Sequence, residues 1–92
     1  MRRHACDAAR LMKAVGNENR LMVLCALAEG ELSVSDLLER VALSQSALSQ
    51  HLAVLRREGL VKTRRESQSI YYSLSSPTAA KLIEFLYSTY CA

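Results

Sequence analysis

LSQSALSQHLAVLRREG, residues 43–59, is the most informative stretch of the chain because it carries the start, the body and the end of one helix. Ser44 is a favourable N-cap, and Gly59 is the residue type that ends helices in the left-handed conformation. Three leucines recur at helical spacing on one face, at Leu48, Leu52 and Leu55. This pattern predicts an amphipathic helix that is bounded at both ends.

The opposite face of this helix is polar and uncharged. It holds Gln45, Ser46, Ser49 and Gln50, whose side chains are donors and acceptors suited to the edges of DNA bases. The helix ends on two basic residues that can reach phosphate, Arg56 and Arg57. We therefore interpret the segment as a DNA recognition helix, with an ordinary exposed polar face as the alternative.

Apolar residues at helical spacing predict three further helices before the recognition helix, over residues 5–15, 18–29 and 34–41. Asn17 can cap the second of them, and Ser33 with Asp36 forms a capping-box pattern for the third. The residues expected to point inward are Ala8, Leu11, Met12, Val15, Leu21, Leu24, Cys25, Ala28, Val34, Leu37, Leu38 and Val41. Only two residues separate the third helix from Ser44, which is helix-turn-helix spacing.

A β-hairpin is predicted after Gly59, from the segments 60–65 and 69–74, which are rich in Val, Thr, Ile and Tyr. Lys62, Arg64 and Arg65 give it positive charge, and Gln68 falls near its tip, where a β-ribbon can touch phosphate or the minor groove. A solvated charged hairpin is the alternative. Together these segments predict a winged helix-turn-helix, a mainly α fold with a small β-hairpin.

The last predicted helix starts at the pair Ser76-Pro77, a cap followed by proline at the first helical position. It is apolar almost all round, and a small domain cannot bury that much surface. The Ala-rich first helix has the same excess. We therefore expect a homodimer through the N- and C-terminal helices. Such a dimer would read two half-sites of an imperfect palindrome in double-stranded operator DNA.

The composition fits one domain, residues 1–92, because half of the residues are hydrophobic and the chain is short. Residues 44–74 carry five basic and two acidic side chains, whereas residues 21–43 carry one and four. We expect a cytoplasmic, nucleoid-associated protein, because the sequence lacks a long apolar run and its N-terminus does not resemble a signal peptide. Enzymatic activity is not expected, since neither His4 nor His51 is placed to activate a cysteine.

The motifs NENRLMVLCAL, ELSVSDL, LSQSALSQHLAVLRREGLV and RRESQSIYYSL resemble the ArsR family of dimeric winged-helix repressors along essentially the whole chain. The resemblance assigns base reading to Gln45, Ser46, Ser49 and Gln50, and wing contacts to Arg64, Arg65 and Gln68. His51 belongs to the same SQHL motif, and we interpret it as a packing residue or a phosphate contact rather than a ligand.

The resemblance also argues against metal sensing. The cysteines that arsenic and cadmium sensors carry within ELxVxDL are replaced here by Ser33 and Ser35. The other common metal site of the family uses Asp and His residues along the last helix, and residues 75–92 contain neither type. A zinc or soft-metal site needs three or four Cys, His or carboxylate ligands, whereas the three cysteines here are scattered along the sequence. We expect neither a metal ion nor a cofactor.

Cys25 in RLMVLCAL and Cys91 in LYSTYCA resemble the dithiol of the branch of this family that senses persulfides and oxidants. The resemblance implies that a disulfide or a short polysulfide joins them, weakens operator binding and makes reactive sulfur species or oxidants the inducer. In the alternative the cysteines are silent, and the protein is an anti-silencer or activator, or is controlled by a partner or a metal. Cys6 has no counterpart in the pattern; we interpret it as a bystander, with an intermolecular crosslinker or a nearby helper thiol as the alternatives.

Overall fold

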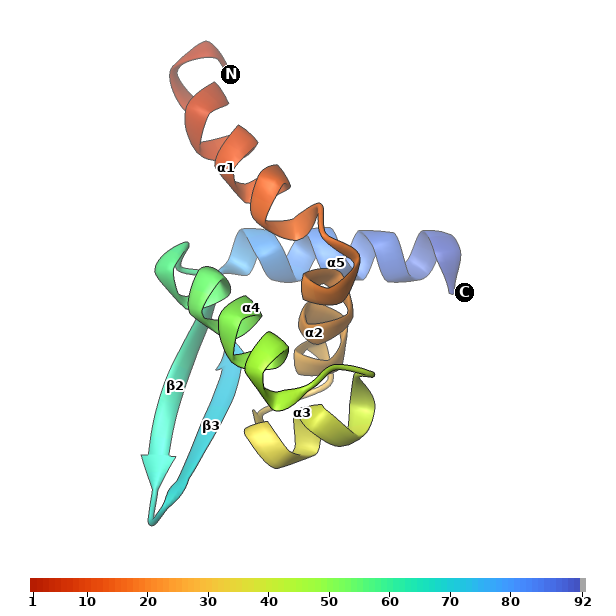
Figure 1. Ribbon diagram of the computed structural model, residues 1–92. Coiled ribbons are helices and arrows are strands. Elements are labelled where there is room, and N and C mark those ends of the chain that lie inside the picture. The colour runs from red at the N-terminus through yellow and green to blue at the C-terminus, as the bar shows by residue number, and fades with distance from the viewer. Residues whose placement is uncertain (92) are drawn as a thin grey trace.

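The computed structural model describes residues 1–91. In chain order its elements are η1 (Arg2–His4), α1 (Ala5–Val15), α2 (Glu18–Ala28), β1 (Leu32–Ser33), α3 (Val34–Arg40), α4 (Gln45–Arg57), β2 (Val61–Glu66), β3 (Ser69–Leu74) and α5 (Pro77–Tyr90). Helices α3 and α4 form the helix-turn-helix, and the β2–β3 hairpin extends from the body as the wing (Figure 1). The predicted winged helix-turn-helix is confirmed.

The helix starts are where the capping residues predicted them. The side chain of Asn17 accepts a hydrogen bond from the backbone N–H of Arg20 over 3.0 Å. Ser33 and Asp36 form the complete capping box, with N···O distances of 3.1 and 3.2 Å. Ser44 and Ser76 cap α4 and α5 in the same way. Each of these signals is local in sequence, and this is why the sequence alone reveals it.

The core surrounds α2, which contacts every other α-helix and β3. Val23, Leu24, Ala26 and Leu27 are all buried, so α2 is apolar on more than one side. The single inward stripe predicted for this helix was therefore wrong at Ala28, which is exposed. A helix enclosed by several neighbours has no single buried face.

The sheet has three antiparallel strands in the order β1–β3–β2, and the sequence revealed only the hairpin. Strand β1 escaped prediction because it has two residues, and Ser33 is also the cap of α3. Strand β2 runs from Val61 to Glu66, so Glu66 belongs to the strand and not to the predicted turn. The turn is the residue pair 67–68, in which Ser67 has a φ of 56°.

Helices α1 and α5 carry apolar side chains that the body of the protein does not cover. Helix α1 projects away from the body, and α5 crosses behind α2 (Figure 1). The exposed fractions of Met12, Phe85 and Tyr90 are 57%, 63% and 81%. The prediction that Met12 points inward was wrong, because α1 buries only its last two residues, Ala14 and Val15.

Candidate DNA-binding face and thiol pair

Helix α4 separates a packing face from a polar face. Its leucines Leu48, Leu52 and Leu55 are at most 2% exposed and anchor it in the core. The four residues predicted to read bases are all exposed, namely Gln45, Ser46, Ser49 and Gln50. His51 is half-buried between the two faces, and Gly59 ends the helix region with a φ of 75°. The buried leucines therefore anchor this helix in the core and leave its polar face open to solvent.

A groove runs between α4 and the wing. It has a volume of about 490 Å³, and its lining residues are Ser49, Ala53, Arg56, Arg57 and Tyr72. Tyr72 belongs to β3, and the other four belong to α4. The groove thus brings one of the predicted base-reading serines together with both arginines of the last helical turn.

The strand register divides the positive charge of the wing between two faces. Thr63 lies opposite Tyr72, and side chains alternate along a strand, so Arg65 shares the face of Tyr72 that borders the groove. Lys62 and Arg64 lie on the other face. Gln68 is exposed in the turn at the tip of the wing, as predicted from the sequence.

Arg64 is engaged by carboxylates rather than free. Its guanidinium pairs with Glu31 at 2.7 Å from Nη2 and 3.1 Å from Nε, and with Glu66 at 2.5 Å from Nη1. It also lies over the ring of Tyr71, 4.8 Å from the centroid. Hydrogen bonding to Arg64 lowers the pKa of the Glu31 carboxyl. Glu31 is 33 positions away in sequence, so no local pattern reveals this contact.

The two sequence-predicted thiols come from the two helices that cross at the core. Cys25 is half-buried on α2 and lines a cavity of about 470 Å³ between α2, β3 and α5, together with Ile83 and Tyr87. Cys91 is exposed and is the C-cap of α5, and its N–H donates to the carbonyl of Tyr87 over 2.8 Å. Burial raises the pKa of the Cys25 thiol, and the charge of the neighbouring Cys91 adds to this rise. Cys6 is exposed on α1.

Two further features of residues 1–91 concern ligands and membranes. No group of three or more His, Cys, Asp or Glu side chains in this range is arranged to hold a metal ion. No helix in the same range combines the length and the apolar character needed to cross a bilayer.

The family of the chain follows from comparison with known proteins. The model of the arsR family of bacterial regulatory proteins matches residues 17–63. The chain belongs to the ArsR family. This match covers α2, the helix-turn-helix and the start of the wing, so the DNA-binding unit described above is the one shared by these transcriptional regulators.

Three relatives of this ArsR-family chain are similar over most of its length. The transcriptional activator HlyU of Vibrio cholerae is 53% identical over 99% of this chain and 84% of its own length. The structure of its reduced form has a TM-score of 0.96 at 52% identity, covering 100% of this chain and 97% of that one. The biofilm growth-associated repressor of Agrobacterium fabrum is 46% identical over 100% of this chain and 79% of its own length.

The third relative bears on assembly. It is the homodimeric winged helix-turn-helix DNA-binding domain Mb0332 of Mycobacterium bovis, with a TM-score of 0.81 at 31% identity. The match covers 90% of this chain and 77% of that one. ArsR-type regulators bind DNA and form homodimers, and the present fold is of this type.

Proposed function

We propose that this ArsR-family regulator binds a palindromic operator as a reduced homodimer and represses transcription until Cys25 and Cys91 are bridged. The observation that carries the proposal is the placement of the two thiols: Cys25 lines a cavity together with Tyr87 and Ser88 of α5, and Cys91 is the C-cap of the same helix. The proposal is also supported by HlyU of V. cholerae, because a solved structure of this relative is described as its reduced form. Persulfides and oxidants are the proposed inducers.

The surroundings of the two thiols suggest the order of the reaction. Cys91 is exposed and meets the inducer first, whereas Cys25 is half-buried and is held mostly as the neutral thiol. With a low-molecular-weight persulfide, the Cys91 thiolate attacks the terminal sulfur and releases the parent thiolate. The Cys25 thiolate then attacks the inner sulfur of the Cys91 persulfide, forming the disulfide and releasing hydrosulfide. Each step is a two-electron exchange between sulfur atoms.

The bridge reaches the DNA-binding face through α2. Helix α5 and helix α4 both pack on α2, so a covalent tie between Cys25 and the end of α5 changes the support of the recognition helix. In a homodimer such a change alters the separation of the two recognition helices and loses contacts at one half-site. Allosteric coupling of this kind is typically about 1 to 3 kcal/mol, or roughly 5- to 150-fold in affinity.

A second candidate is an activator or anti-silencer whose cysteines are silent. The V. cholerae relative is named a transcriptional activator, which favours activation, whereas the A. fabrum relative is named a repressor. Both candidates share the operator-binding dimer. They differ in whether the state of Cys25 and Cys91 changes the affinity for DNA.

Peptide mass spectrometry of the protein after treatment with glutathione persulfide tests the thiol chemistry. We expect Cys25 and Cys91 to be joined within one chain, directly or through additional sulfur atoms, and Cys6→Ser to leave this product unchanged. A stable adduct on Cys91 with Cys25 still free would contradict the bridging proposal. So would a product in which Cys6 is an obligatory partner.

A further inference from the structure

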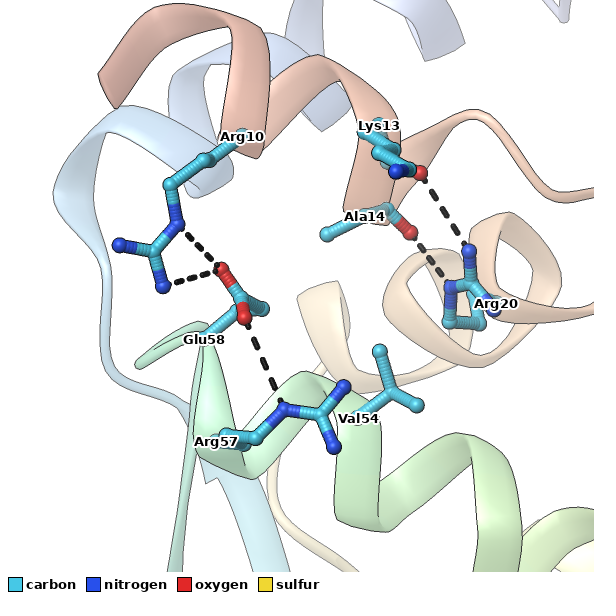
Figure 2. Close-up of a pocket in the computed structure, with 7 residues that line it drawn as sticks. All are labelled: Arg10, Lys13, Ala14, Arg20, Val54, Arg57 and Glu58. Carbon is cyan, nitrogen blue, oxygen red and sulfur yellow. Dashed lines mark hydrogen bonds and ion pairs between the residues drawn. The ribbon is translucent and has the colours of Figure 1, made fainter. Parts of the chain in front are cut away.

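A pocket of about 410 Å³ lies between α1, the start of α2 and the end of α4, outside the groove described above (Figure 2). Its lining holds four basic side chains and one carboxylate. These residues are Arg10, Lys13, Arg20, Arg57 and Glu58, with Ala14 and Val54 completing the wall. The excess of positive charge makes the pocket suited to an anion.

The basic side chains are positioned by contacts within the protein. Arg20 donates to the carbonyl oxygens of Ala14 and Lys13 at the end of α1, over 2.7 and 3.3 Å. Glu58 holds Arg10 at 3.0 Å and Arg57 at 3.7 Å, and Figure 2 shows both pairs on one side of the pocket. Within residues 1–91 no carboxylate pairs with the Lys13 ammonium. One carboxylate therefore leaves most of the positive charge uncompensated.

The pocket adjoins the groove between α4 and the wing at Arg57, whose side chain lines both. The other basic residues of the pocket lie beyond Arg57, with Arg10 and Lys13 on α1 and Arg20 on α2. We propose that the pocket binds a phosphodiester group of the DNA backbone beyond the bases read by α4. The inference rests on operator binding through α4 and does not depend on the thiol switch.

The exposure of the pocket favours a backbone phosphate over a free small anion. The side chains of Arg10 and Arg57 are 62% and 70% exposed. Sites for small ligands usually enclose most of the ligand surface, whereas phosphate contacts of DNA-binding proteins are made by exposed basic side chains on an open face. A phosphate that is part of a bound duplex needs no enclosure, because the contacts in the groove hold the duplex in place.

Lys13→Gln tests this assignment, with Lys81→Gln as the matched control on the exposed surface of α5. Lys13 is chosen because it makes no ion pair whose loss would disturb the fold. Binding to an operator duplex is measured by fluorescence anisotropy over a range of salt concentrations. We expect Lys13→Gln to weaken binding severalfold and to lower the slope of log K against log[salt] by about one for each pocket engaged. Because Lys81 lies one helical turn before Phe85 of the proposed dimer interface, both variants are first shown to have the mass of the wild-type dimer by light scattering, and Lys81→Gln should then match the wild type in DNA binding.

Ethylation interference then locates the phosphate. Ethylation of a phosphate outside the bases contacted by α4 should impair the wild type and have no added effect on Lys13→Gln. The inference is overturned if Lys13→Gln behaves as Lys81→Gln does. It is also overturned if inorganic phosphate raises the Tm of the wild type but not of Lys13→Gln while operator binding is unchanged, since the site would then serve a free anion. Failure of the wild type to bind any duplex would instead refute operator binding itself.

Discussion

At the scale of single residues, the two thiols of the proposed switch differ in their environment. Cys25 lies half-buried on α2 beside Ile83 and Tyr87 of α5, whereas Cys91 is exposed at the end of α5. Removing a thiolate from water disfavours the charged form, and a second thiolate nearby disfavours it further. Both effects raise the pKa of Cys25, so in the reduced protein this thiol stays protonated at neutral pH and is a weaker nucleophile than a thiolate.

The first prediction concerns the pH dependence of Cys25 alkylation by iodoacetamide in a Cys6→Ser background. Because only the thiolate reacts, the midpoint of the rate profile should lie above that of the same cysteine in the unfolded protein. Adding Cys91→Ser should move the midpoint part of the way back, since burial remains and the neighbouring charge is lost. Peptide mapping measures the rates. A folded-state midpoint at or below the unfolded one would contradict the assigned environment.

The raised pKa also has a consequence for stability. Since the folded state favours the neutral thiol, Cys25 contributes stability that is present below its unfolded pKa. That contribution is lost as the pH rises through the folded pKa, in the alkaline range. Substituting serine at this position should therefore flatten the alkaline decline in the free energy of unfolding of the reduced protein.

At the level of secondary-structure elements, one face of the wing is fixed by the contacts of Arg64, and the other face is open toward the groove against α4. Arg64 ties β2 to Glu31, which immediately precedes β1, and Glu66 and Tyr71 complete its contacts. Arg65 lies on the opposite face, which borders the groove against α4. We therefore expect Arg65 to contact phosphate and Arg64 to position the wing, although both were predicted from the sequence as DNA contacts.

The second prediction compares three wing variants in the anisotropy assay over a range of salt concentrations. Arg65→Gln should weaken operator binding and lower the salt slope by about one per protomer, because a phosphate contact is lost. Arg64→Gln and Glu31→Gln should both weaken binding at an unchanged slope, because each breaks the same brace.

Glu31→Gln is the informative control, since it removes a negative charge. If Arg64 were a phosphate contact, releasing it from Glu31 would strengthen DNA binding. Tighter binding by Glu31→Gln, or a lowered salt slope in Arg64→Gln, would contradict the positioning role.

The elements also show what the sequence could and could not predict. The capping residues Asn17, Ser33, Ser44 and Ser76 marked four helix starts, because a cap and the N–H that it accepts from are three residues apart. The brace of Arg64 and the basic pocket were not predictable, because each joins segments distant in sequence. Met12 on α1 was predicted to point inward but is exposed. Periodicity identifies the apolar face of a helix, but it does not show whether another element covers that face.

At the scale of the whole molecule, the fold connects the thiol pair, the recognition helix and the surface proposed for dimerisation. Helix α2 bears Cys25 and contacts α1, α4 and α5, so it links this thiol to the recognition helix and to both terminal helices. The uncovered apolar side chains of α1 and α5, including Met12, Phe85 and Tyr90, are the proposed interface of the homodimer. A change in the packing of α5 would then act on both protomers at once.

The decisive measurement for the thiol switch is the affinity of the dimer for its operator duplex before and after treatment with glutathione persulfide, measured by fluorescence anisotropy alongside Cys25→Ser. We expect treatment to lower the affinity of the wild type by roughly 5- to 150-fold, the variant to keep its affinity, and dithiothreitol to restore the wild type. An unchanged affinity in both proteins, with the Cys25–Cys91 bridge verified by mass spectrometry, would contradict the switch and leave the cysteines structural.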